Sequence, residues 1–320
     1  MSDYTATAPP FPYFGGKRRA ASIVWSALGD PAGYVEPFAG SAAVLLARPP
    51  FPGRRVETLN DADGWLINAW RSIRLSPATT AGHAYGPVAE IDYHARLAWL
   101  QERRTPDLVA WLEGDPEHHD PKAAGWWLYV LACGIGEPFG SGPWRVIEGH
   151  LRNTKAIGNA GRGVNRELPH LGDAGRGALV AYLERLAARL ARVRITCGDW
   201  ERVVTPSVVR AGTGGDGARA VFLDPPYATS GDLYAHTDTG VADHVRAWCL
   251  TPAAENLRVV LAGYDDEHDD LLAHGWPVTQ GRSGGGAGYS TNPRNGRRER
   301  LWLSPACLTS QPSLFDEVAS

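Results

Sequence analysis

Short apolar runs, each followed by polar or turn-forming residues, recur in both halves of the chain. They end near residues 36, 61, 197, 223 and 303. Runs of this length are typical of buried strands, and stretches with helical spacing lie between them. The pattern predicts an α/β fold in which helices cover a mainly parallel sheet.

Two stretches in the middle of the chain have the pattern of helices. Between residues 89 and 112 the apolar positions follow a helical period, with a break expected near Thr105-Pro106. Residues 122–133 are more apolar and include Trp126 and Trp127. This composition favours a buried helix over a platform on which bases stack.

The strand-like runs occupy two separate parts of the chain. We expect residues 1–73 and 194–308 to form one Rossmann-like sheet, and residues 74–193 to form a mainly helical domain inserted into it. Residues 309–320 form a tail. With 320 residues, 43% of them hydrophobic and 21% charged, the chain is long enough for one large α/β domain plus an insertion.

Composition also limits the environment in which we expect the protein to work. No apolar segment reaches the roughly 20 residues that span a bilayer, and the amino terminus lacks a secretory pattern. The cysteines lie far apart without metal-ligand spacing, at Cys133, Cys197, Cys249 and Cys307. They are interpreted as small buried residues of a cytoplasmic protein without a metal site.

The most informative motif is Asp224-Pro225-Pro226-Tyr227, which follows an apolar strand. The two prolines have no N–H, so this backbone offers only carbonyl acceptors. An exocyclic amine could donate one hydrogen to the Asp224 carboxylate and one to the Pro225 carbonyl, while Tyr227 stacks on the ring for about 1–3 kcal/mol. The alternative interpretation is an acidic strand end followed by a proline turn.

Three other strand ends suit a nucleoside ligand. A strand at residues 34–36 leads through Pro37-Phe38-Ala39-Gly40 into a predicted helix at 42–46. Asp61 lies about 20 residues further on, where doubly wound folds place a ribose-binding carboxylate. Asp199 and Trp200 could bond and stack on an adenine. Alternatively, the glycine marks an ordinary turn, Asp61 caps a helix and Trp200 belongs to the core.

Charge gives mixed support for nucleic-acid binding. The formal net charge is −3, whereas a non-specific DNA-binding protein is usually basic. Basic residues nevertheless gather between residues 144 and 176 and again between 294 and 300. The positions expected to contact DNA are Arg145, Arg152, Lys155, Arg162, Arg166 and Arg298. Solvated arginine-rich loops are the alternative.

Together with Pro12-Tyr13-Phe14-Gly15-Gly16-Lys17, these motifs resemble the DNA adenine methylase family, the amino-methyltransferases with an Asp-Pro-Pro-Tyr motif. The resemblance extends from about residue 11 to 305 and is strongest to phage-encoded members. The cofactor motif precedes the catalytic motif, with a long stretch between them. This order is similar to the α group of the family, whose target-recognition domain is inserted there.

The resemblance implies S-adenosylmethionine as methyl donor and assigns a role to each motif. Tyr13 and Lys17 match the motif that contacts the methionine end of the cofactor. The remaining matches to the cofactor site are Glu36, Phe38, Gly40, Asp61, Asp199 and Trp200. Asp224, Pro225, Pro226 and Tyr227 match the target-base site. The family's turn is richer in glycine than the Gly40-Ser41-Ala42-Ala43 segment here.

The implied activity is site-specific methylation of adenine N6 in double-stranded DNA by a monomer that flips the base out of the helix. The alternative substrates are cytosine N4, for which related enzymes carry Ser at the first motif position, a protein glutamine amide, for which they carry Asn, and a base amine in RNA. A catalytically silent DNA-binding module is the non-enzymatic alternative. The recognition sequence and any role in restriction–modification stay open.

The tail contains a second, smaller resemblance. Gln311-Pro312-Ser313-Leu314-Phe315 is similar to the pentapeptide with which bacterial replication proteins bind the sliding clamp. Gln311, Leu314 and Phe315 would make that contact. Packing of Leu314 and Phe315 on the sheet is the alternative.

Overall fold

The computed structural model of the protein describes eleven separate ranges of the chain. These are residues 8–11, 17–50, 55–103, 107–115, 117–134, 144–147, 150–153, 175–210, 217–226, 240–281 and 298–308. For 144–147 and 150–153 only the backbone is described. No helix in these ranges is long and apolar enough to cross a membrane.

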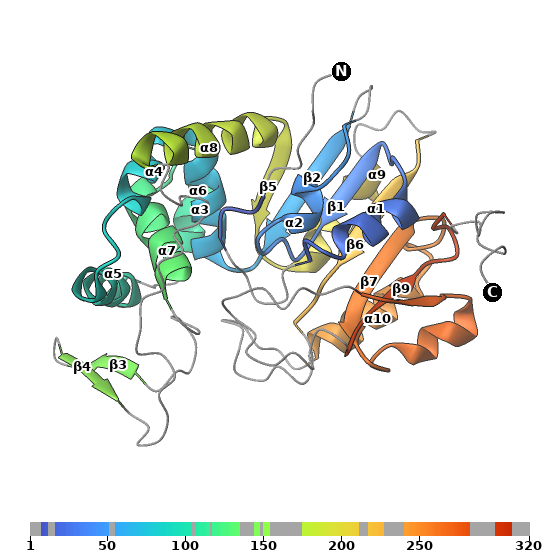
Figure 1. The fold of residues 1–320 in the computed structure, drawn as a ribbon. Coiled ribbons are helices and arrows are strands. Elements are labelled where there is room, and N and C mark those ends of the chain that lie inside the picture. Colours follow the sequence, from blue (N-terminus) through green and yellow to red (C-terminus); the bar gives the residue numbers. More distant parts are fainter. Residues whose placement is uncertain are drawn as a thin grey trace, which may run out of the picture.

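Seven strands of the described chain form one mixed sheet (Figure 1). In spatial order they are β5 (Val193–Cys197), β2 (Val56–Asp61), β1 (Gly33–Glu36), β6 (Arg219–Leu223), β7 (Arg258–Tyr264), β9 (Glu299–Leu303) and β8 (Val278–Gln280). The strands from β5 to β7 pair in parallel, and β9 runs antiparallel to both of its neighbours. The strand runs expected from the sequence are confirmed.

Successive residues of the central strands belong to two different hydrophobic cores, because side chains alternate between the faces of a sheet. On β6, Phe222 packs in one core and Val221 in the other. The same alternation separates Val260 from Val259 on β7. Each face is therefore covered, as in doubly wound α/β proteins.

The sequence predicted only the helices at 42–46, within 89–112 and at 122–133, whereas the described chain has ten α-helices. They are α1 (Ala21–Leu28), α2 (Ala43–Leu46), α3 (Gly64–Leu75), α4 (Pro77–Ala84), α5 (Glu90–Glu102), α6 (Asp107–Gly114), α7 (Pro121–Cys133), α8 (Gly175–Leu190), α9 (Pro206–Arg210) and α10 (Val241–Cys249), with 3-10 turns η2 (Trp200–Val203) and η4 (Asp269–His274). The pair α5 and α6 confirms the break near 105, and α7 is the expected buried helix. The helix predicted at 42–46 is a single turn.

The helices between residues 64 and 190 gather at the β5 side of the sheet (Figure 1). Leu128 of α7 and Leu183 of α8 belong to the same core as Leu59 of β2 and Phe222 of β6. A continuous core therefore joins this helical region to the sheet. The region also contains a hairpin of β3 (Trp144–Ile147) and β4 (His150–Asn153), which the sequence did not predict.

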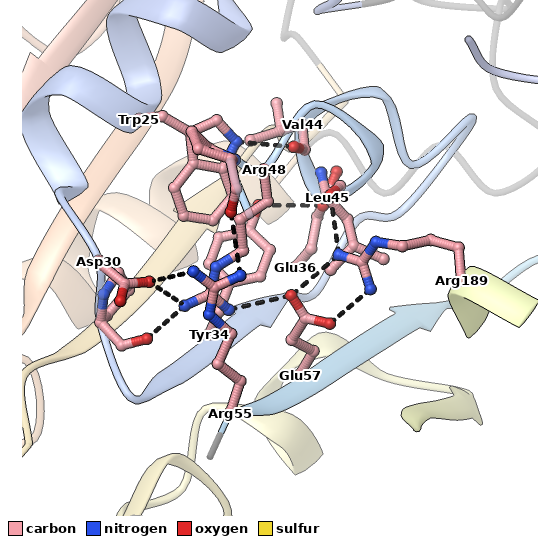
Figure 2. A network of polar contacts seen from close by, with 12 residues as sticks. Trp25, Asp30, Tyr34, Glu36, Val44, Leu45, Arg48, Arg55, Glu57 and Arg189 are labelled. Carbon is pink, nitrogen blue, oxygen red and sulfur yellow. Dashed lines mark hydrogen bonds and ion pairs between the residues drawn. The ribbon is translucent and has the colours of Figure 1, made fainter. Parts of the chain in front are cut away.

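A buried network of ion pairs lies at the amino ends of β1 and β2 (Figure 2). The guanidinium of Arg48 contacts Glu57 of β2 at 2.9 Å and Asp30 at 3.1 Å. Arg189, from the end of α8, reaches the other Glu57 oxygen at 2.7 Å. Glu57 thus joins α8 to the sheet through Arg189, and the segment after α2 through Arg48.

Removal of the Glu57 carboxylate is expected to destabilise the fold strongly. Glu57 is 8% exposed and Arg48 only 1%, so Glu57→Ala leaves a buried cation without its principal partner and costs about 3–5 kcal/mol. Burial alone would raise the pKa of Glu57, but Arg189 and Arg48 lower it. Its contribution is therefore present above the ordinary pKa and is lost as pH falls.

Urea denaturation at pH 7 measures this cost. The control is Asp243→Ala, which removes an ion pair of 2.9 Å to Arg246 from a carboxylate that is 67% exposed. This control is expected to cost less than about 1 kcal/mol. Equal losses in the two variants would contradict the anchoring role of Glu57.

Candidate functional site

The order of the parallel strands reverses direction between β1 and β6. From β1 the chain proceeds outward to β2 and β5, and from β6 it proceeds the other way to β7. Ligands of such sheets bind outside the carboxyl ends of the strands at this switch point. Here an acid ends or closely follows each of four adjacent strands: Glu36, Asp61, Asp199 and Asp224.

Asp224 follows β6 and is held by a buried lysine. The Lys17 ammonium lies 2.9 Å from Oδ1 of Asp224 and 2.6 Å from Oε1 of Glu299. Lys17 is 3% exposed, Glu299 1% and Asp224 19%. Burial alone would lower the pKa of Lys17, but the two carboxylates raise it above its ordinary value, so Lys17 stays charged.

Glu299 was not identified from the sequence. It is the first residue of β9, and an antiparallel strand begins at the edge where its parallel neighbours end. That rule places Glu299 near Asp224 once the direction of β9 is known. The sequence signal for Glu299 was an acid two residues before the apolar run at 301–303. The arginines around it led us to interpret the segment at 294–300 as a basic loop.

Glu36 ends β1 beside this group and is buried. Its Oε2 accepts hydrogen bonds from the Tyr34 hydroxyl at 2.9 Å and from the Leu45 N–H at 3.1 Å. Burial raises the pKa of Glu36 to about 8, although these two hydrogen bonds oppose the shift. A positively charged ligand nearby would favour its ionised form.

The turn after β1 is fixed at both ends of the Gly40 backbone. The Gly40 N–H donates to Oδ2 of Asp61 at 3.0 Å, and the Trp70 indole donates to the Gly40 carbonyl at 3.1 Å. Gly40 has a φ of 46° and Ala42 a φ of 51°. The left-handed conformation favours glycine, so the Ala42 position is where a richer glycine turn would fit.

Asp61 ends β2 in a defined orientation. Besides Gly40 N–H, its carboxylate accepts from the Asp63 N–H at 3.0 Å. Burial raises the pKa of Asp61 to about 6, against the effect of these bonds. Asp63 is the residue that caps α3, so Asp61 is not used as its cap.

Asn60 joins the loops of this edge and was not recognised as a site residue. Its side-chain amide donates to the Pro37 carbonyl at 3.1 Å and to the Gly198 carbonyl at 2.9 Å. Its oxygen accepts from the Thr196 hydroxyl at 2.9 Å. Asn60 therefore fixes the distance between the loops that follow β1 and β5.

The predicted adenine-binding pair has two different environments. Asp199 is exposed and accepts from the Glu201 N–H at 2.7 Å, which caps the first turn of η2. Trp200 is buried and stacks on Phe38 with a centroid distance of 6.0 Å and an interplanar angle of 29°. Trp200 thus has the core contacts of the alternative interpretation, and its cofactor contact stays a prediction.

Several predicted site residues lie outside the described chain: Tyr13, Tyr227, Lys155, Arg162, Arg166, Gln311, Leu314 and Phe315. Arg145 and Arg152 are cross-strand partners in the β3–β4 hairpin. Arg298 is half-buried, forms an ion pair with Asp265 and lies over the Tyr264 ring. Within the described residues no group of three His, Cys, Asp or Glu side chains could hold a metal ion.

The fold is that of an α/β protein with a seven-stranded mixed sheet, compatible with a Rossmann-like fold, and acids end or closely follow four adjacent strands. No protein-family model matches the chain, and no curated protein matches it. The residues present at this edge suit a ligand with a cation and with hydroxyl donors. Glu36 and Asp61 both have raised pKa values, and carboxylates accept hydroxyl hydrogens.

The stability of the protein is expected to depend on the ionisation of Glu36. Because its pKa is raised from 4.5 to about 8, its stabilising contribution is complete below pH 4.5 and is lost as pH rises toward 8. The Glu36→Gln variant cannot ionise at this position. The difference in melting temperature, variant minus wild type, should therefore increase as pH rises from 4.5 to 8. The exposed variant Glu255→Gln is the control, and a difference independent of pH would contradict the prediction.

Proposed function

We propose that the protein is an S-adenosylmethionine-dependent methyltransferase that modifies the N6 amine of adenine in double-stranded DNA. The observation that carries this proposal is the position of Asp224. Its carboxylate lies at the strand switch point, beside the acids that end β1 and β2, and is fixed to the buried Lys17. The resemblance of the motifs supports the same assignment.

Asp224 and Pro225 would hold the target amine. The Asp224 carboxylate is 19% exposed, so it can accept a hydrogen from a ligand while Oδ1 stays bonded to Lys17. The Pro225 carbonyl would accept the second amine hydrogen. Two acceptors favour a tetrahedral nitrogen, whose lone pair is then available for attack.

The neighbouring strand ends would hold the methyl donor. Asp61 would accept from the ribose hydroxyls, Glu36 would balance positive charge, and Asp199 would accept from the adenine amine. S-adenosylmethionine would supply a methyl group bonded to a positively charged sulfur, which is a good leaving group. The amine nitrogen forms the new N–C bond, the C–S electron pair goes to sulfur, and the nitrogen releases one proton to water.

Residues 74–193 are proposed to recognise the DNA target. Arg145 and Arg152 are register partners in the β3–β4 hairpin, so two basic residues share one position along this ribbon. DNA phosphates would contact both of them, and a two-stranded ribbon fits the major groove. The flipped adenine would then reach Asp224.

The test of this function is product analysis. The protein is incubated with methyl-labelled S-adenosylmethionine and unmethylated DNA, and the DNA is digested to nucleosides. Label in N6-methyladenosine supports the proposal. Label in cytosine, in RNA or in a protein amide would establish a different amino-methyltransferase, and no transfer to any of them would favour the silent DNA-binding module.

Asp224→Ala is expected to abolish methyl transfer and to leave S-adenosylmethionine affinity within about threefold of wild type, because the acceptor for the amine is lost. Single-turnover transfer and calorimetric binding measure the two effects. Asp243→Ala, an exposed carboxylate variant, is the control. Equal loss of binding and transfer would show that Asp224 has another role.

Arg145→Gln and Arg152→Gln are expected to weaken DNA binding uniformly across sequences. Each lost phosphate contact should also reduce the slope of log affinity against log salt by about 1. The control is Arg192→Gln, an exposed arginine that directly precedes the amino end of β5. An unchanged slope in both hairpin variants would contradict the assignment of Arg145 and Arg152.

The carboxyl-terminal segment is proposed to bind the bacterial sliding clamp through Gln311, Leu314 and Phe315. Deletion of residues 311–315 is expected to eliminate binding to purified clamp, measured by surface plasmon resonance. Methyl transfer to free DNA should be unchanged. Binding that survives the deletion, or that is absent from the intact protein, would end this proposal.

A further inference from the structure

We infer that Glu299 is a positioning residue for the proposed methyl transfer: through Lys17 it fixes the orientation of the Asp224 carboxylate. This inference rests on the proposed function for its consequence, but its geometric part can be tested independently. It also gives Lys17 a role beyond the cofactor contact implied by the resemblance.

Three distant segments meet at the Lys17 ammonium. Lys17 precedes α1, Asp224 follows β6 and Glu299 begins β9, and both carboxylates lie within 2.9 Å of the ammonium nitrogen. The shorter contact, 2.6 Å, is made to the more deeply buried partner, Glu299. Glu299 is therefore the fixed end of this arrangement, and Asp224 is the end that reaches solvent.

The backbone around Glu299 gives this anchor little freedom. Glu299 pairs in register with Tyr264 at the carboxyl end of β7, and its carbonyl accepts from the Gly281 N–H at 3.0 Å. The Glu299 backbone is thus held by β7 on one side and by the residue that follows β8 on the other. A side chain on such a supported backbone can define the position of Lys17 within a fraction of an ångström.

The charges of the group explain why an anchor is needed. One ammonium lies between two carboxylates, so it could move toward either of them. Glu299 holds Lys17 from the buried side, and Lys17 in turn fixes Oδ1 of the Asp224 carboxylate. Asp224 then receives the amine in a fixed direction, which is the condition for in-line attack.

This arrangement gives Asp224 the role of a hydrogen-bond acceptor. One of its oxygens accepts from the Lys17 ammonium, and the carboxylate fixed in this way can orient the amine of the target base.

Glu299→Gln tests the role, with Glu255→Gln as the matched control on an exposed position before β7. Glutamine keeps the shape and an acceptor for Lys17 but removes the charge. We expect kcat to fall about tenfold or more while KM for S-adenosylmethionine changes less than about twofold. A merely structural role would lower the melting temperature and leave kcat per folded molecule unchanged, which would overturn the inference.

A second measurement requires no methyl transfer. The ¹³C resonance of the Asp224 carboxyl carbon, identified by its loss in Asp224→Asn, should move in Glu299→Gln and stay in place in Glu255→Gln. If wild type transfers no methyl group, the proposed function fails while a shifted resonance still supports the positional coupling. A resonance unchanged by Glu299→Gln would refute the coupling even in an active enzyme.

Discussion

Parallel pairing of β5, β2, β1 and β6 is the constraint on which the site depends. Because these strands point the same way, their carboxyl ends meet at one edge, and the acids that follow them are brought within reach of a single ligand. Mutual repulsion and burial make such a group unfavourable without cations. Lys17 offsets part of this cost at Asp224, whereas burial raises the pKa values of Glu36 and Asp61.

Two further groups of contacts stabilise this edge of the sheet, one at the amino ends of the strands and one between the loops at their carboxyl ends. The Glu57 network holds α8 at the amino ends of β1 and β2 (Figure 2). Asn60 joins the loops at the carboxyl ends of β1 and β5. Leu45 connects the amino-end network with the carboxyl-end acids, since its N–H donates to Glu36 and its carbonyl accepts from Arg189. The helical region thus supports the site through hydrogen bonds as well as through a shared core.

Five strands and the helices over residues 89–112 and 122–133 could be predicted from the sequence because each has a local apolar pattern, whereas β7, β8, α3 and α8 were not predicted. The run at 220–223 is β6, and the apolar residues 122–133 are α7, since burial requires such patterns. Glu36, Asp61 and Asp224 could be selected because each ends or directly follows a strand. Their proximity then follows from the parallel sheet.

Features that depend on strand direction or on a specific partner could not be predicted in this way. Glu299 joins Asp224 only because β9 is antiparallel, and an isolated acid before an apolar run does not indicate direction. The β3–β4 hairpin lies in an arginine- and glycine-rich stretch with little apolar alternation. The short α2 results from the left-handed backbone at Gly40 and Ala42, which the residue types do not specify.

We propose that S-adenosylmethionine binds at the carboxyl edge of β1, β2 and β5, next to Asp224. A crystal structure with the product S-adenosylhomocysteine tests it most directly. We expect the ribose hydroxyls within hydrogen-bond distance of Asp61 and the thioether sulfur facing the Asp224 side of the edge. Density for the ligand at any other surface, with this edge unchanged, would contradict the proposed cofactor site.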